Sequence, residues 1–377
     1  MEDDDLRRDR LLAALALIVG AAFFLGLPFA LQAGMEFFMP LTAALVISIA
    51  LVPLLEWLER RRFPSAVAAF LSTLAFLVLM NIALAVIVIP ASSWFALIPN
   101  TVPRIQRNLA PLIDFYASLQ EFIDRTLTSI AVETEATAQA VAATAPTSVV
   151  DYFLSAAPSA AIRLFFAILV IFFFLAGWTR LRKRAIRRRG SFDSAMQTAR
   201  VIQDVVDVTA NYLATITIIN GVLGLSMALL LWMLGMPSPF MWGGIVMLCN
   251  FVPYFGPIVA SILLGLGGLM TFDAVGYALM PALIFIIVHT VEANILTPVI
   301  LGRRLTINPL LILVSLSFWS WVWGTAGALL AVPLLLIFQT ILRSTGTPDF
   351  AGFLFERGTL TGADIGRNHS DETDLSK

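Results

Sequence analysis

Charge is scarce in this chain: Asp, Glu, Lys and Arg make up 13% of its 377 residues, whereas hydrophobic residues make up 59%. Soluble globular proteins carry about 25% charged residues, so this composition excludes an ordinary soluble domain. Long stretches have no charged residue at all, namely 11–35, 37–55, 63–103, 164–179, 208–272 and 305–342. A helix needs about 20 apolar residues to cross a hydrocarbon core of about 30 Å. The sequence therefore predicts an all-α, polytopic helical membrane protein embedded in a lipid bilayer.

Residue types that serve many enzymes are also nearly missing. The single cysteine, Cys249, excludes an internal disulfide and is interpreted as a buried structural thiol. Two histidines, His289 and His369, are too few for a His-rich zinc site. The chain has neither the Gly-x-x-x-x-Gly-Lys-[Ser/Thr] sequence of P-loop pumps nor a Gly-x-Ser-x-Gly nucleophile elbow. We therefore expect no enzymatic activity, no metal site and no cofactor.

Basic residues are almost all arginines, and they gather at Arg7–Arg10, Arg60–Arg62 and Arg180–Arg189. Nucleic-acid binding is one interpretation of the last cluster, but a basic loop beside a membrane span explains it better. Since such loops stay in the cytoplasm, we predict a multi-pass protein of the inner (plasma) membrane with both termini cytoplasmic.

Changes in composition divide the chain into seven parts. The central polar part has apolar residues at helical spacing, such as Leu109, Ile113 and Tyr116, so amphipathic helices outside the bilayer are expected there. These helices need a partner surface, which makes a homo-oligomer plausible. The predicted parts are 1–10, a cytoplasmic arm; 11–93, three spans; 94–155, the extracytoplasmic segment; 156–179, the fourth span; 180–207, a basic loop and amphipathic helix; 208–342, the transport core; and 343–377, a disordered tail.

The last third completes a total of about eight hydrophobic segments and allows two topologies. Segments 238–270 and 305–342 are too long for one upright span, and each is interrupted near its middle by glycine or proline. If both were kinked full spans, Arg303 and Arg304 would lie outside. If they are re-entrant hairpins, entering from opposite sides, these arginines and the C-terminus lie inside. The distribution of positive charge favours the hairpins.

Glu292 is the most informative residue, because it and Asp273 are the only charged residues between Asp207 and Arg303. A carboxylate inside an apolar span is costly and usually lines a cavity or pathway. His289 stands three residues earlier, on the same helix face, and histidine titrates near neutral pH. The pair could carry protons, or it could be a fixed contact between helices. Asn294 lies about 200° around the helix from Glu292 and is predicted to serve another face or cap a break.

Proline inside a helix removes one backbone hydrogen bond and frees a carbonyl, which in hydrocarbon must be buried in protein or line a wet cavity. Each break alone could be an ordinary kink; their clustering with Glu292 favours a transport site of interrupted helices. Asn250 is a further cavity candidate. The breaks are at Pro253, Pro257, Pro298, Gly324, Gly327 and Pro333.

Several short sequences together resemble the autoinducer-2 exporter family, also described as PerM-like permeases, over most of residues 11–342. They are Pro40, Pro53 and Leu58–Pro64; Leu234–Pro237; Phe251–Pro257, which includes Gly256; Glu292–Asn294, Pro298, Gly302, Asn308 and Pro309; and Gly324, Gly327 and Pro333. Two positions depart from the family pattern, since Ala214-Thr215 replaces a Gly-Gln pair and His289 replaces a common glutamine. The resemblance implies export of small polar signalling molecules, or cation/proton antiport.

The expected function is therefore secondary transport, most simply export, of a small polar metabolite or signalling molecule. Coupling to H⁺ through Glu292 is the first expectation, and Na⁺(K⁺)/H⁺ antiport is the second. A membrane scaffold acting through residues 91–155 is the alternative from another class.

Overall fold

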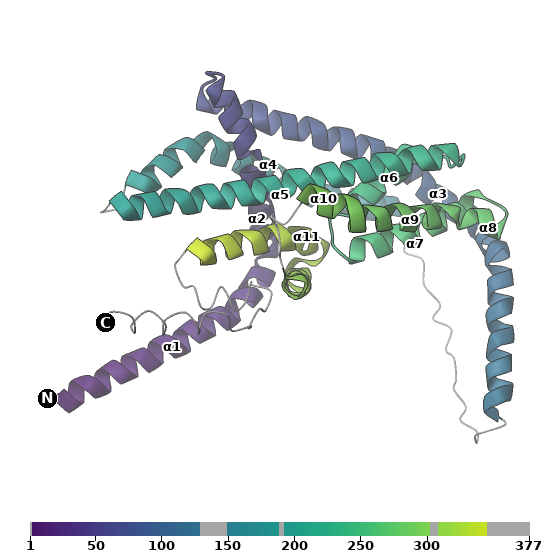
Figure 1. Ribbon diagram of the computed structural model, residues 1–377, viewed down its shortest axis with the longest axis horizontal. Coiled ribbons are helices and arrows are strands. Elements are labelled where there is room, and N and C mark those ends of the chain that lie inside the picture. Colours follow the sequence, from purple (N-terminus) through teal and green to yellow (C-terminus); the bar gives the residue numbers. More distant parts are fainter. Residues whose placement is uncertain (1, 129–148, 188–191, 302–307, 345–377) are drawn as a thin grey trace, which may run out of the picture.

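The computed structural model describes residues 2–128, 149–187, 192–301 and 308–344, and these residues form helices without any strand. Figure 1 shows long helices crossing one another, with α1 and the end of α3 extending away from the rest. The prediction of an all-α fold is confirmed. In chain order the elements are α1 (Glu2–Ala33), α2 (Met35–Arg60), α3 (Ser65–Thr128), α4 (Val149–Arg187), α5 (Phe192–Met233), α6 (Pro239–Cys249), α7 (Phe255–Thr271), α8 (Val275–Ala278), α9 (Met280–Val291), the π-helix η1 (Glu292–Leu296), α10 (Thr297–Leu301) and α11 (Pro309–Ser344).

Within the described residues, seven helical stretches are long and apolar enough to span a membrane. With the shorter apolar pair α6 and α7, they account for the eight hydrophobic segments expected from the sequence. Leu15, Val78 and Phe173 each expose more than half of their surface, an arrangement that a surrounding bilayer favours. The seven stretches are Leu11–Ala33, Met35–Arg60, Ser65–Ser92, Ala160–Arg187, Ser194–Met233, Val275–Ile300 and Pro309–Arg343.

Two clusters of buried apolar side chains hold the helices together, and α5 contributes to both. The first joins α2, α3, α4 and the N-terminal part of α5. The second joins the C-terminal part of α5 to α6, α7 and α9. In a bilayer the stabilisation comes from close van der Waals packing, because lipid tails are as apolar as the side chains. The first cluster includes Val52, Leu55, Ala69, Leu175 and Val206, and the second includes Met227, Trp242, Val246, Leu264 and Phe285.

Helices α6 and α7 form a helical hairpin, called hairpin 1 below. Helix α6 has 11 residues, so it is about 16 Å long and cannot cross a bilayer. Trp242, near the start of α6, packs against Gly267, near the end of α7, so the two arms run antiparallel. At the turn, Gly256 lies against the carbonyl of Cys249 with no room for a Cβ. The two helices fold back on each other, and the expectation that this hairpin enters and leaves the membrane on one side stays a prediction.

Helix α11 is also folded back on itself, and its two arms are called hairpin 2. The backbone leaves the helical conformation at Trp323 and Gly324, and Gly324 has φ 62°, which favours glycine. Ser315 Oγ donates a hydrogen bond of 2.8 Å to the carbonyl of Ala331. Those residues would stand about 24 Å apart in a straight helix. Arms 309–322 and 325–344 therefore lie side by side.

Hairpin 2 does not pack primarily on the span that carries Glu292. Its main contacts are with α5, α2 and α1. Val332 and Leu336 pack against Tyr212 of α5, and Trp323 Nε1 donates a 3.1 Å hydrogen bond to the carbonyl of Leu31 at the end of α1. Hairpin 1, in contrast, packs directly on α9.

The part of α3 beyond its membrane stretch binds the end of hairpin 1. Asn108 is buried and donates to the carbonyls of Leu269 (3.2 Å) and Phe272 (2.9 Å). Arg104 donates to the carbonyl of Met270 at 3.1 Å and pairs with Asp273 at 3.1 Å. The last carbonyls of a helix have no partner within the helix, so these donors stabilise the C-terminus of α7. Of the predicted extracytoplasmic segment 94–155, residues 129–148 lie outside the described residues.

Candidate transport site

Glu292 begins a π-helix in the C-terminal third of the span Val275–Ile300. The backbone N–H of Thr297 donates to the carbonyl of Glu292, five residues earlier, where an α-helix would bond four residues earlier. Pro298 follows at once and has no N–H to continue the α-helical pattern, which accounts for a break at this place. Such single π-turns are frequent at functional sites.

The π-turn places two polar side chains on the carboxylate of Glu292. The residue is buried, with 7% of its surface exposed. Thr297 Oγ1 donates a short hydrogen bond to Oε1, and His289 Nδ1 lies 3.1 Å from Oε2. The His289 contact is close, but it is not a well-directed hydrogen bond. The His289 ring also stacks on Phe285, with centroids 5.6 Å apart, so it is held on one face of α9.

Two asparagines complete the polar group. Asn250, at the turn of hairpin 1, interacts with the Glu292 carboxylate and donates a 2.8 Å hydrogen bond to Asn220 Oδ1 on α5. Asn220 is fully buried, and its Nδ2 has no hydrogen-bond partner among the described residues. A buried donor without a partner is costly, so this nitrogen is available to a water or a solute. Below, "the Glu292 cluster" means Glu292, His289, Thr297, Asn250 and Asn220.

Comparison with known proteins supplies the family. Residues 11–346 match the AI-2E family of transporters, which is nearly the whole described part of the chain. The chain belongs to the AI-2E transporter family.

Among relatives in this family, the chain is 26% identical over 314 residues to the AI-2 transport protein TqsA of Escherichia coli (strain K12), an alignment that covers 82% of this chain and 86% of TqsA. It is 23% identical to YhhT of the same organism, covering 84% of this chain and 86% of YhhT. It is 29% identical to MT0215 of Mycobacterium tuberculosis (strain CDC 1551 / Oshkosh), covering 81% and 82%. The last two are named as candidate transport proteins. The predicted family is confirmed.

Several predicted residues lie around the Glu292 cluster of this AI-2E transporter. Pro253, Gly256 and Pro257 form the turn of hairpin 1 and the start of α7, next to Asn250. The carbonyl of Pro253 accepts from Phe255 N–H at 2.7 Å, so the carbonyl that Pro257 leaves free is satisfied within the turn. Hairpin 1 thus supplies one wall of the site.

Asn294 takes a different position from Glu292. It is exposed, and its Nδ2 donates to the carbonyl of Thr290 at 2.8 Å. This hydrogen bond satisfies a backbone carbonyl of the same helix, and a role of Asn294 in transport stays a prediction.

The remaining predicted residues belong to hairpin 2 or to the chain before it. Gly324, Gly327 and Pro333 lie in α11, and the contacts of that element lead to α1, α2 and α5. Asn308 caps the start of α11, since its Oδ1 accepts from Leu310 N–H at 3.0 Å, and Pro309 occupies the first helical position, which it suits. Gly302 lies outside the described residues.

Thr297 was not foreseen as part of the site. Five positions along a regular α-helix turn a side chain by about 140°, away from the first residue. Pro298 is the one sequence signal that the helix is not a regular α-helix at this place, so that the angle of about 140° does not apply. Among the residues that the structure describes, no group of three or more His, Cys, Asp or Glu side chains could hold a metal ion.

Proposed function

We propose that this AI-2E transporter exports a small polar metabolite or signalling molecule and that Glu292 couples export to protons. The observation that carries the proposal is a buried carboxylate at a π-turn, surrounded by polar side chains from α5, hairpin 1 and the span itself. TqsA is named for transport of AI-2, which supports a polar signalling molecule as the class of solute.

The Glu292 cluster has the chemistry that coupling requires. An ionised carboxylate only accepts hydrogen bonds, whereas a protonated one also donates. A proton on Glu292 would therefore change which hydrogen bonds His289, Thr297 and a polar solute can make with it. If the solute hydroxyls and the proton compete for the same oxygens, binding of one releases the other.

Solute flux in proteoliposomes tests this directly. With an imposed pH gradient, we expect wild-type protein to move small polyols or hydroxylated carbonyl compounds and to move protons in the opposite direction. Glu292→Gln keeps the size of the side chain but cannot ionise, so the proton-linked component should disappear. Asp207→Asn is the matched control, because Asp207 is an exposed carboxylate on α5. Flux of unchanged rate and pH dependence in Glu292→Gln would contradict the coupling role.

Antiport of Na⁺ or K⁺ against H⁺ is the second candidate. Carboxylate, amide and hydroxyl oxygens from Glu292, Asn250 and Thr297 are the ligand types that hard cations accept. In the same liposomes, this function predicts proton flux that requires a cation and no organic solute. Flux that requires the solute and ignores the cation would reject it.

Further parts of the proposal concern the setting of the transporter. We place it in the inner membrane with both termini cytoplasmic, on the distribution of arginine. The extension of α3 beyond its span is the surface through which a homo-oligomer would form. A scaffold that acts through that extension would keep its function after Glu292→Gln and lose it when the extension is deleted. In the flux experiment, a scaffold predicts no solute or proton flux even in the wild type.

A further inference from the structure

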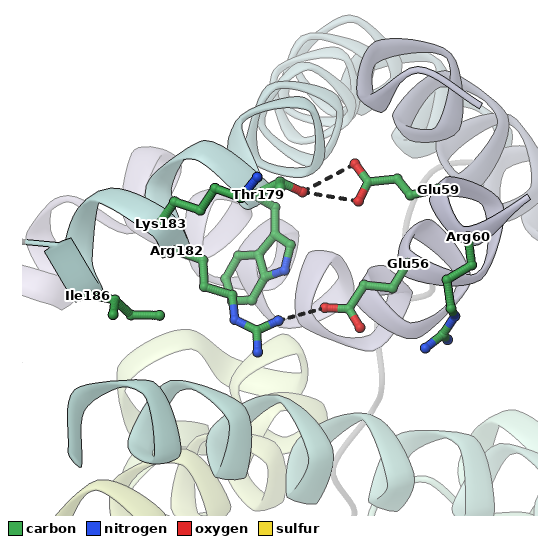
Figure 2. A pocket seen from close by; sticks show the side chains of 8 residues that line it. Glu56, Glu59, Arg60, Thr179, Arg182, Lys183 and Ile186 are labelled. Atoms are coloured by element: carbon green, nitrogen blue, oxygen red, sulfur yellow. Dashed lines mark hydrogen bonds and ion pairs between the residues drawn. The ribbon is translucent and has the colours of Figure 1, made fainter. Parts of the chain in front are cut away.

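A cavity of about 430 Å³, with several charged residues in its lining, opens between the C-terminal ends of α2 and α4, far along the chain from the Glu292 cluster. Figure 2 shows Glu56, Glu59 and Arg60 on one side and Thr179, Arg182 and Lys183 on the other. The cavity is open to its surroundings at the basic end of both helices.

Part of the charge in this cavity is already paired. Arg182 lies 3.0 Å from Glu56, and it also donates to Gln203 of α5 at 2.6 Å. The Arg182 side chain therefore links three helices and neutralises Glu56. These contacts are structural. The other charged residues of the lining are Glu59, Arg60 and Lys183.

Glu59 has no basic partner. Thr179 Oγ1 donates to its two carboxylate oxygens, each at 3.1 Å, and no ion pair involves it among the described residues. Both oxygens still have acceptor capacity. A half-buried carboxylate in this state suits a ligand that carries a cationic donor.

The lining also has basic side chains that form no ion pair among the described residues. Arg60 and Lys183 are exposed, and neither forms an ion pair within the part of the chain that the structure describes. Trp178 Nε1, which belongs to the same lining, is buried and has no acceptor in the described ranges of the chain. Two cations and one free N–H together suit an anionic group with several oxygens, such as a phosphate.

The cavity lies where a bilayer has its headgroups. The spans Met35–Arg60 and Ala160–Arg187 both end beside it. Trp57 and Leu181 expose apolar surface there, and Arg61 stacks over the Trp57 ring at 5.0 Å. Tryptophan and arginine at the end of a span are typical of the membrane interface. A phospholipid headgroup can reach the cavity while its acyl chains stay among the exposed apolar side chains.

We propose that this cavity binds the headgroup of a phospholipid that carries a primary ammonium and a phosphate. The ammonium donates to Glu59, and the phosphate lies toward Lys183, Arg60 and the indole N–H of Trp178. A choline headgroup has no N–H to donate to Glu59. A glycerol headgroup has no cation to offset the negative charge of Glu59. The site therefore distinguishes phosphatidylethanolamine from phosphatidylcholine and phosphatidylglycerol.

The test uses delipidated full-length protein in detergent, with lipid binding counted by native mass spectrometry and followed by the shift in unfolding temperature. We expect wild-type protein to bind phosphatidylethanolamine about tenfold more tightly than phosphatidylcholine, since one charge-assisted hydrogen bond distinguishes the two. Glu59→Gln should remove that preference. Lys183→Gln should weaken all phospholipids without removing it. Glu36→Gln is the control, because Glu36 is an exposed carboxylate at the other end of α2.

Other outcomes would overturn the proposal. If the three lipids bind equally, the cavity does not distinguish their headgroups. The same conclusion follows if the ethanolamine preference survives in Glu59→Gln. Glycerophosphoethanolamine, which is the headgroup without acyl chains, provides the last comparison. A shift as large as that of the lipid would assign the cavity to a soluble zwitterion instead. If Glu59→Gln does not fold, Thr179→Val, which releases the carboxylate but keeps its charge, should lower the preference in its place.

Discussion

At the scale of single residues, the site depends on which neighbours a buried carboxylate has. Glu292 was conspicuous in the sequence because so few charges interrupt the last third of the chain. His289 could be paired with it by helical spacing, and the two are in contact. Helical spacing could not pair Thr297 or Asn220 with Glu292. The contact of Thr297 depends on the π-turn, and the position of Asn220 depends on how α5 packs against hairpin 1. Residue type and spacing predict the centre of such a site, but not the partners that other elements bring.

The Thr297 hydroxyl should stabilise the folded protein through its hydrogen bond to the Glu292 carboxylate. Replacing Thr297 with Val keeps the shape of the side chain but removes the donor to Oε1. A hydrogen bond to a charged group is worth about 1.5–3 kcal/mol, so we expect a lower unfolding temperature in detergent and slower solute flux. Thr297→Ser keeps the hydroxyl and should restore both. Equal unfolding temperatures for the Val and Ser variants would show that the hydroxyl contributes nothing.

At the scale of elements, the sequence predicted the helices well and their crossings poorly. Length, together with the Asn250–Pro257 and Trp323–Gly327 breaks, was enough to expect that two segments fold back on themselves. The arms of both are antiparallel in the structure. Nothing in the periodicity indicated that hairpin 2 would pack on α5 and α2 while hairpin 1 packs on α9. In hydrocarbon, partner choice depends on shape and small residues more than on an apolar stripe.

The crossing of α5 and α6 shows this dependence on small residues. A Cβ at Gly224 would lie 2.6 Å from the carbonyl oxygen of Gly243, and a Cβ at Gly243 would meet the carbonyl of Gly224 and the side chain of Ala228. The obstacles are largely backbone, so they cannot rotate away. The position of hairpin 1, and with it Asn250, depends on this contact.

Substitution of Gly243 by Ala should therefore destabilise the transporter. Forced overpacking costs about 1–3 kcal/mol, and we expect a lower unfolding temperature and a smaller monodisperse fraction in detergent. Gly221→Ala on α5, the other helix of this crossing, is the control, because a Cβ there has no atom within 4 Å and alanine is the better helix former. If both variants unfold at the temperature of the wild type, the helices are not held at the distance described.

At the scale of the whole molecule, the folded-back α11 bears on the topology, which stays a prediction. Ile312, near the start of hairpin 2, and Leu336, near its end, belong to the same cluster around Tyr212. Both ends of the hairpin therefore lie at the same level along α5. This arrangement supports the topology in which Arg303, Arg304 and the C-terminus share the cytoplasmic side, as the charge distribution favours.

Labelling of single cysteines can establish the sidedness. The background is Cys249→Ser, which removes the one native cysteine. We expect Leu310→Cys and Arg343→Cys, both at exposed positions of α11, to react with a membrane-impermeant maleimide from the cytoplasmic side in inverted vesicles and not in intact cells. Asp273→Cys, at the other end of the intervening span, should show the opposite pattern. Labelling of positions 310 and 343 from opposite sides would make α11 a full crossing, because a re-entrant hairpin returns both of its ends to one surface.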